Sequence, residues 1–227
     1  TSYLAFPYFT NFYSQTMSGS LKEFSGLHHC FLLNFANMKP IKISTAQFEM
    51  KSGDKAYNLS VIENLSAEAA EKGSAAIAFH ECSITGYSYT RHLSLEEMLE
   101  LAEPVPGGES TQKIIRLAKQ YNITILAGLF EKDDNQNLYN TYICADQHGL
   151  IAKHRKIHPF INPNLKPGDN YTVFDIQGWK CGILTCYDNN IIENVRATRL
   201  LGAEILFMPH VTMCTPSTRP GAGFVDP

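Results

Sequence analysis

The sequence predicts one α/β domain whose strands pair both in parallel and as hairpins. Three observations lead to this prediction. Segments with strand and helix periodicity alternate from Met38 onward, several strand segments are almost wholly apolar, and two pairs of strand segments flank short turns. No internal repeat or low-complexity linker divides the 227-residue chain. We therefore expect a single domain over residues 38–227.

The first half of this domain alternates strands with helices. Residues 41–47 carry alternating β-branched side chains and predict a strand. Asp54 stands where a helix N-cap is expected, and that helix stops at Gly73. Residues 75–81 form a short apolar run, which is typical of a strand buried on both faces. Two more helices are expected after it, over residues 95–102 and 110–121.

The second half is richer in strands. Residues 123–130 predict another buried strand, and the turn DDNQN leads from it to an antiparallel partner at 138–146. No strand or helix is expected in the proline- and glycine-rich residues 211–227, which either fold back over the site or precede the natural end of the chain. The remaining segments are a strand with a proline-broken loop (148–160), a hairpin around Gly178 (171–176 and 179–185), a helix ending at Gly202 (189–203) and a buried strand (204–209).

Composition excludes several functional classes. The formal net charge is −3 and there is no basic stripe, so the electrostatic footprint of nucleic-acid binding is missing. No apolar stretch approaches the ~20 residues that span a bilayer, which argues against a membrane protein. The six cysteines form no CxxC pair, so neither a disulfide framework nor a zinc ribbon is expected. We therefore expect a cytoplasmic protein that acts on a small, near-neutral molecule.

Residues 1–37 differ from the rest of the chain. They are rich in Phe and Tyr, carry only Lys22 and Glu23 as charged residues, and match neither a secretory signal nor a transit peptide. We expect them to be a leader or other extension outside the fold, with the natural start at Met38. A mass of the natural protein that places its N-terminus at Thr1 would contradict this expectation.

Three chemically different residues stand at the ends of strand segments. Glu81 ends an apolar run, Lys156 follows the strand LIAKHR, and Cys186 follows CGILT. Reactive groups gather at strand ends in layered α/β folds, because side chains there emerge from a rigid sheet into a crevice. A thiol needs a base to take its proton or a cation to hold its charge. Glu81 could serve as the base, and Lys156 could be the cation that also stabilises an oxyanion.

Each of the three residues also has a purely structural interpretation. A cysteine such as Cys186 at a strand end is, taken alone, more often a small buried hydrophobe. Glu81 alone would more often be a helix cap or a surface acid. Lys156, with Lys153 and Arg155 close by in sequence, would more often be solvated. The combination of all three at strand ends favours the catalytic interpretation.

Other constellations give weaker predictions. His154 and His158 have i, i+4 spacing, but the proline that follows disfavours a helix and no third ligand has metal-site spacing. The adjacent residues 80–82 alternate faces on a strand and cannot all bind one ion. A dyad of Cys186 and His210 stays open as an alternative.

Four segments carry a family resemblance: AQFEMKSGDKAYNL (46–59), FHECSITGY (79–87), GLFEKDDNQNLYNTYICADQHGLIAKHRKIHPF (128–160) and GILTCYDNNIIENVRATRLLGAEILFMP (182–209). They contain the three residues at the strand ends. In this order and spacing they resemble the nitrilase, or carbon-nitrogen hydrolase, superfamily over nearly all of the chain from Met38 onward. The resemblance implies an α/β fold, a four-layer α-β-β-α sandwich with two mixed sheets.

The resemblance also implies a mechanism and an assembly. Glu81 would be the general base, Lys156 would stabilise the tetrahedral intermediate, and Cys186 would be the nucleophile that forms a covalent thioester. The backbone N–H of Tyr187 would share the oxyanion with Lys156. No cofactor or metal is implied. The family usually forms homodimers or larger homo-oligomers, in part through the helix after the nucleophile, here about residues 191–202.

One departure from the family pattern concerns the loop after the lysine. Many members carry a second glutamate there, whereas residues 158–170 offer only Asn162, Asn164 and Asp169. An asparagine could position a substrate or a water, but it cannot share a proton. We expect four residues to be candidates for lining the site: Asn162, Asn164, Asp188 and His210.

A second departure is length. Members normally continue past this point with further strands, so the chain is expected to lack roughly the last third of its domain. Missing strands would leave sheet edges and apolar faces exposed, and the 227-residue chain alone is therefore expected to be poorly active. Glu193 matches the acid of the family pattern CYD-x-x-x-x-E and is expected to be structural.

The residues after the nucleophile bear on the substrate. Amide and carbamoyl hydrolases of the superfamily often show Tyr-Asp there, whereas true nitrilases tend to show Trp-Glu. The sequence CYD therefore favours an amide or an N-carbamoyl amine over a nitrile. An acyltransferase that uses the same three residues and a non-catalytic binding relative remain alternatives, which product analysis with competing amines and the reactivity of Cys186 would distinguish.

Overall fold

The computed structural model describes residues 40–211, 214–215 and 224–225. The extension expected at residues 1–37 lies outside this part of the chain, and so does most of 212–227. In the described residues no helix is both long and apolar enough to cross a bilayer.

The larger sheet has five strands in sequence order. The first three run parallel to one another, and the last two are added as antiparallel hairpins. The DDNQN turn predicted the antiparallel pairing of the third and fourth strands, which is confirmed. The strands are β1 (Ile43–Ala46), β2 (Ala76–Phe79), β3 (Thr124–Lys132), β4 (Leu138–Asp146) and β5 (Gly149–Arg155).

The smaller sheet has the order β6-β7-β8. β6 (Thr172–Ile176) and β7 (Trp179–Ile183) form the predicted antiparallel hairpin around Gly178, whose φ of 86° is left-handed. β8 (Ile205–Phe207) returns parallel to β7 after a helical crossover. Both sheets are therefore mixed or hairpin-derived, as the sequence predicted.

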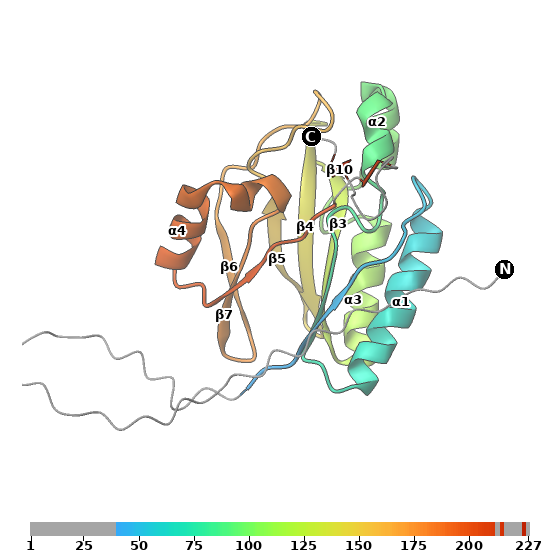
Figure 1. The fold of residues 1–227 in the computed structure, drawn as a ribbon. Helices are drawn as coiled ribbons and strands as arrows, with labels where there is room; N and C mark the ends of the chain where they lie inside the picture. Colours follow the sequence, from blue (N-terminus) through green and yellow to red (C-terminus); the bar gives the residue numbers. More distant parts are fainter. Residues whose placement is uncertain (1–39, 212–213, 216–223, 226–227) are drawn as a thin grey trace, which may run out of the picture.

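Helices cover the outer faces of the two sheets (Figure 1). α1 (Lys55–Glu71) and α3 (Glu109–Tyr121) lie together against the larger sheet, and α4 (Ile192–Leu200) lies beyond the smaller one. The layers are thus helix, sheet, sheet and helix, which confirms the predicted four-layer architecture. The Asp54 side chain accepts a hydrogen bond from the Tyr57 N–H, so the N-cap of α1 is also confirmed. The short α2 (Leu95–Leu101) begins with a capping box at Ser94.

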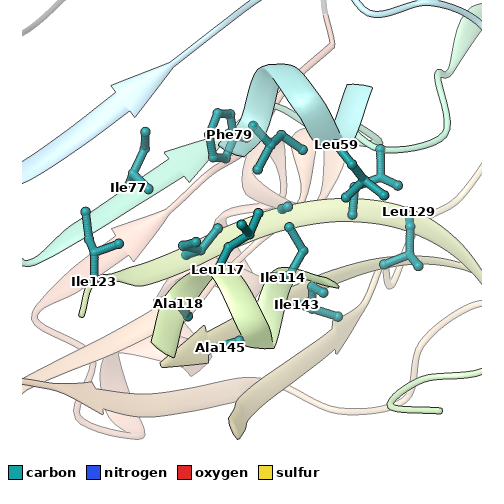
Figure 2. Close-up of a cluster of buried hydrophobic side chains, with 14 of the residues drawn as sticks. Leu59, Ile77, Phe79, Ile114, Leu117, Ala118, Ile123, Leu129, Ile143 and Ala145 are labelled. Atoms are coloured by element: carbon teal, nitrogen blue, oxygen red, sulfur yellow. The ribbon is translucent and has the colours of Figure 1, made fainter. Parts of the chain in front are cut away.

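Two apolar cores join the layers. Leu59, Ile114 and Leu117 of the helices pack on Ile77 and Ile143 of the larger sheet (Figure 2). The second core lies between the sheets and includes Leu126, Cys144, Phe174, Cys181 and Phe207.

α4 approaches the smaller sheet very closely, since a Cβ on Gly182 would stand 2.5 Å from Cγ2 of Thr198. These contacts make a rigid frame for the loops at the strand ends.

Two expectations need correction. The helix predicted over 189–203 is shorter, because residues Cys186–Asn190 form a separate 3₁₀ turn, η3, ahead of α4. Residues 211–227 were expected to contain no strand, but β9 (Cys214–Thr215) and β10 (Phe224–Val225) pair antiparallel. Strands of two residues are too short to produce a recognisable periodicity.

Candidate active site

Glu81 is positioned by the segment that follows β2. Its carboxylate is fully buried and accepts hydrogen bonds from three donors. Lys156 Nζ and Asn140 Nδ2 each lie 2.7 Å from Oε1, and the Val211 N–H lies 3.3 Å from Oε2. The two donors on Oε1 leave Oε2 as the oxygen with fewer partners. The carboxylate is therefore held in one orientation by donors of the kind that a buried acid requires.

Lys156 is the residue directly after β5, and its side chain is also fully buried. Its backbone N–H donates to the Asn140 carbonyl at 2.8 Å, so β4 fixes the point where β5 ends. Its ammonium lies 4.9 Å from the ring centroid of Phe160 and 5.6 Å from that of Tyr87. Two aromatic faces and one carboxylate thus compensate a cation that has lost its water.

Cys186 begins the η3 turn, three residues beyond β7. Its φ of 52° is left-handed, and its N–H donates to the Pro209 carbonyl at 2.9 Å. Burial, together with the negative charge and the hydrogen bond of Glu81, raises the pKa of Cys186 to about 11. Lys156 and the Tyr187 N–H, which hydrogen-bonds the sulfur, act in the opposite direction. At neutral pH the group is a thiol with a carboxylate beside it.

Asp188 ties the turn of Cys186 to the segment after Lys156. Its fully buried carboxylate accepts the N–H groups of Ile157 at 3.1 Å, His158 at 2.8 Å and Thr185 at 3.3 Å. Nε2 of His154 lies 3.3 Å away. Burial alone would raise the pKa of Asp188, but these donors hold it below its ordinary value. The carboxylate therefore fixes two of the three strand ends relative to each other.

A carbon-nitrogen hydrolase family model matches residues 42–222, which is most of the chain. The chain belongs to this family. The nitrilase of Pyrococcus abyssi is 32% identical over 172 residues, and the omega-amidase NIT2 of Xenopus tropicalis is 33% identical over 184. These alignments cover 74% and 76% of this chain, respectively, but only 64% of each relative. The chain thus spans less than two thirds of the length of each of these relatives.

Solved structures give the same assignment. Saccharomyces cerevisiae Nit3, a member of branch 10 of the nitrilase superfamily, matches with a TM-score of 0.67 and 27% identity, over 77% of this chain and 65% of that one. The amidase of Nesterenkonia sp. AN1 matches with a TM-score of 0.63 and 22% identity, over 75% and 67%. The fold is therefore that of the nitrilase superfamily.

The other predicted site residues of this carbon-nitrogen hydrolase chain lie in different settings. The Asn162 amide is buried and donates to the carbonyls of Thr90 and Leu93, while its oxygen accepts the Asn164 N–H, so it braces the loop after Lys156. His210 is exposed, and its Nε2 lies 2.6 Å from the amide of Asn189. Partial desolvation of its ring lowers the pKa of His210, the negative charge of Glu81 raises it, and the positive charge of Lys156 lowers it. Among the described residues no group of three potential ligands could hold a metal ion.

Sequence reasoning did not single out Asn140. It lies inside β4, where it donates to Glu81, and its Oδ1 accepts a 3.4 Å contact from the Cys82 thiol. The sequence signal for it was a polar residue inside a predicted strand, a signal that the neighbouring Thr141 shares, and the structure shows both residues to be buried. Asp188 was expected to line the site, whereas its carboxylate holds the turn of Cys186 and the segment after Lys156 together.

Proposed function

We propose that this chain carries the catalytic centre of an enzyme that hydrolyses the carbon-nitrogen bond of a small amide or N-carbamoyl amine. The observation that carries the proposal is the fully buried ion pair of Glu81 and Lys156, 2.7 Å apart, together with the Cys186 thiol, whose pKa is raised by burial and by the nearby charge of Glu81. A base, a cation and a nucleophile in mutual contact are what acyl transfer through a cysteine requires.

The first half-reaction forms a thioester. Cys186 is a thiol at neutral pH, so Glu81 takes its proton as the sulfur attacks the carbonyl carbon of the substrate. The oxyanion that develops is stabilised by the ammonium of Lys156 and by the Tyr187 N–H. Collapse of the tetrahedral intermediate breaks the carbon-nitrogen bond, and Glu81 returns the proton to the departing nitrogen.

The second half-reaction consumes water. Glu81 takes a proton from the water that attacks the thioester, and the same donors stabilise the second oxyanion. The carbon-sulfur bond then breaks and the thiol of Cys186 regains its proton, which restores the starting state. Lys156 contributes electrostatic stabilisation in both half-reactions. The cycle uses only side chains of the site and one water.

The amide preference has two supports. Tyr-Asp follows the nucleophile, and several relatives are named amidases, among them an (R)-stereoselective amidase from Pseudomonas that is 28% identical over 175 residues. A nitrile is the second candidate because the Pyrococcus abyssi relative is named a nitrilase. Attack on a nitrile would use the same cysteine.

The test compares substrates and nucleophile variants of the natural protein. We expect ammonia release from a primary amide or an N-carbamoyl amine, loss of that activity in Cys186→Ala, and an acyl adduct on Cys186 detected by mass spectrometry. Competing amines separate hydrolysis from acyl transfer, which would yield a new amide. Faster turnover of a nitrile than of either other substrate would contradict the amide assignment, and full activity of Cys186→Ala would refute the mechanism.

The surface of α4 supports assembly of the natural protein into a homodimer or larger homo-oligomer. Three apolar side chains at this helix are strongly exposed: Ile192 at 70%, Leu200 at 76% and Leu201 at 51%. Such a cluster is typical of a surface that another chain covers. Leu200→Glu is expected to lower the sedimentation-derived mass, and an unchanged mass would exclude this contact.

A further inference from the structure

Tyr87 holds a buried hydroxyl that has no hydrogen-bond partner among the described residues. The side chain is 2% exposed, so bulk water does not supply the missing partner. A buried donor without an acceptor is unfavourable, and native structures rarely retain one unless it has a task. The described residues therefore leave this hydroxyl without an acceptor and available to a bound molecule.

The surroundings of this hydroxyl are the groups of the catalytic centre. Lys156 Nζ lies 5.6 Å from the centroid of the Tyr87 ring. Burial raises the pKa of Tyr87 strongly, and the nearby charge of Glu81 raises it further. The phenol therefore keeps its proton at every working pH. It can only donate its hydrogen bond or accept one, and it cannot act as a base.

The backbone around Tyr87 is rigid. Gly86 has a left-handed φ of 83°, and a Cβ there would stand 3.0 Å from both the Ser52 backbone and the Tyr89 ring. On the other side, the Tyr87 carbonyl accepts the Thr90 N–H at 3.0 Å and the Thr90 hydroxyl at 2.6 Å. The unpaired hydroxyl is consequently held in place next to the triad by fixed structure.

We infer that Tyr87 is a further catalytic residue, whose hydroxyl donates a hydrogen bond to the reacting amide group of the bound substrate. This inference rests on the function proposed above. A donor that lacks a partner among the described residues gains one when the substrate binds, so its hydrogen bond favours the complex and its transition state. A donor already paired within the protein would have to give up that bond first.

Tyr87→Phe in the natural protein tests this inference, because it removes one oxygen atom and keeps the ring. We expect kcat/KM for the preferred amide to fall about ten- to a hundredfold. The melting temperature should stay equal or rise, because the variant loses an unsatisfied polar atom and no protein contact.

Tyr89→Phe is the matched control, two residues away. The Tyr89 hydroxyl donates to the Thr85 carbonyl at 3.2 Å, so its loss should lower the melting temperature and leave kcat/KM within about twofold of the wild type. Kinetics of Tyr87→Phe within about twofold of the wild type would overturn the inference, whatever its melting temperature. A hydroxyl that held only a buried water as a structural bridge would give that result together with a lowered melting temperature.

The same assay separates this inference from the proposed function. If Cys186→Ala abolishes amide hydrolysis and Tyr87→Phe leaves it intact, only the role of Tyr87 fails. If amide hydrolysis does not depend on Cys186, the proposed function fails and the inference about Tyr87 fails with it.

Discussion

Gly128 lies so close to Cys82 that a Cβ on the glycine would stand 2.3 Å from the Cys82 backbone nitrogen. Two hydrogen bonds also join Gly128 to the segment after Cys82. The Ile84 N–H donates to the Gly128 carbonyl at 2.9 Å, and the Gly128 N–H donates to Oγ of Ser83 at 3.2 Å. The segment that carries Glu81 is thus pressed against β3, and the absence of a side chain at residue 128 sets where the carboxylate lies.

Gly128→Ala is therefore expected to move the segment after Glu81. Overpacking against backbone costs about 1–3 kcal/mol or more, so the free energy of unfolding in urea should fall by at least that amount. Activity per folded molecule should fall as well. Gly107→Ala is the control, because its nearest neighbour would be 4.0 Å away, and equal stabilities of the two variants would contradict the prediction.

Glu81→Gln should raise the alkylation rate of Cys186 and lower the rate of amide hydrolysis. The negative charge of Glu81 raises the pKa of the thiol, so its removal should increase the thiolate fraction and the rate of alkylation by iodoacetamide at pH 8. Amide hydrolysis should fall by about a hundredfold or more, since the base is lost. Mass spectrometry of the Cys186 peptide and ammonia release measure the two rates.

Glu131→Gln is the control for that experiment. Glu131 is another buried carboxylate, but it pairs with Lys153 and Arg155 on β5, both at 2.7 Å. Its loss should reduce stability and leave the alkylation rate of Cys186 unchanged. A slower alkylation in Glu81→Gln would mean that Glu81 also serves as the base for alkylation, contrary to the prediction.

Asp188→Asn should reduce stability in a pH-dependent way. The folded state lowers the pKa of this carboxyl, so the unfolded state binds the proton more tightly and the stabilisation is present above the ordinary value of 3.8. We expect a loss of about 2–3 kcal/mol at pH 7. The difference from the wild type should shrink as the pH falls below about 4. Urea unfolding between pH 7 and pH 3 measures it, and a constant difference would contradict the account.

Asn140→Leu should slow catalysis without weakening substrate binding. The variant keeps the volume and removes the amide that holds Oε1 of Glu81, so kcat should fall about tenfold while KM stays within about twofold. In the control Asn137→Leu, the lost amide belongs to the Asp133 turn instead. If KM rises and kcat is unchanged, Asn140 contacts the substrate and does not orient the base.

Local patterns in the sequence determine much of this fold. β2 and β3 were predicted within two residues at each end, and β4 was predicted with its bounds, because runs of apolar residues between polar turns identify buried strands. The placement of Glu81, Lys156 and Cys186 at strand ends followed from the same patterns. Their mutual contact required the resemblance to a known family as well.

The parts that could not be predicted depend on contacts between distant residues. Asn140 reaches Glu81 across 59 residues, and periodicity carries no information about such a partner. The prediction placed Asn189 and Asn190, the last two residues of η3, in the helix, because nothing local shows that Cys186 adopts a left-handed backbone or that Asp188 binds two residues about 30 positions upstream. Tertiary structure decides both features.

The left-handed backbone of Cys186 has an evolutionary consequence. An L-residue with φ near 52° is strained, whereas glycine adopts this conformation freely. A mutation from cysteine to glycine would relieve this backbone strain and remove the nucleophile, so it would favour the folded backbone while abolishing the reaction. In related proteins that no longer need the reaction, no loss of folding stability would oppose this mutation. In a surviving lineage, the cysteine would then persist only while selection for its chemistry outweighs the gain in stability.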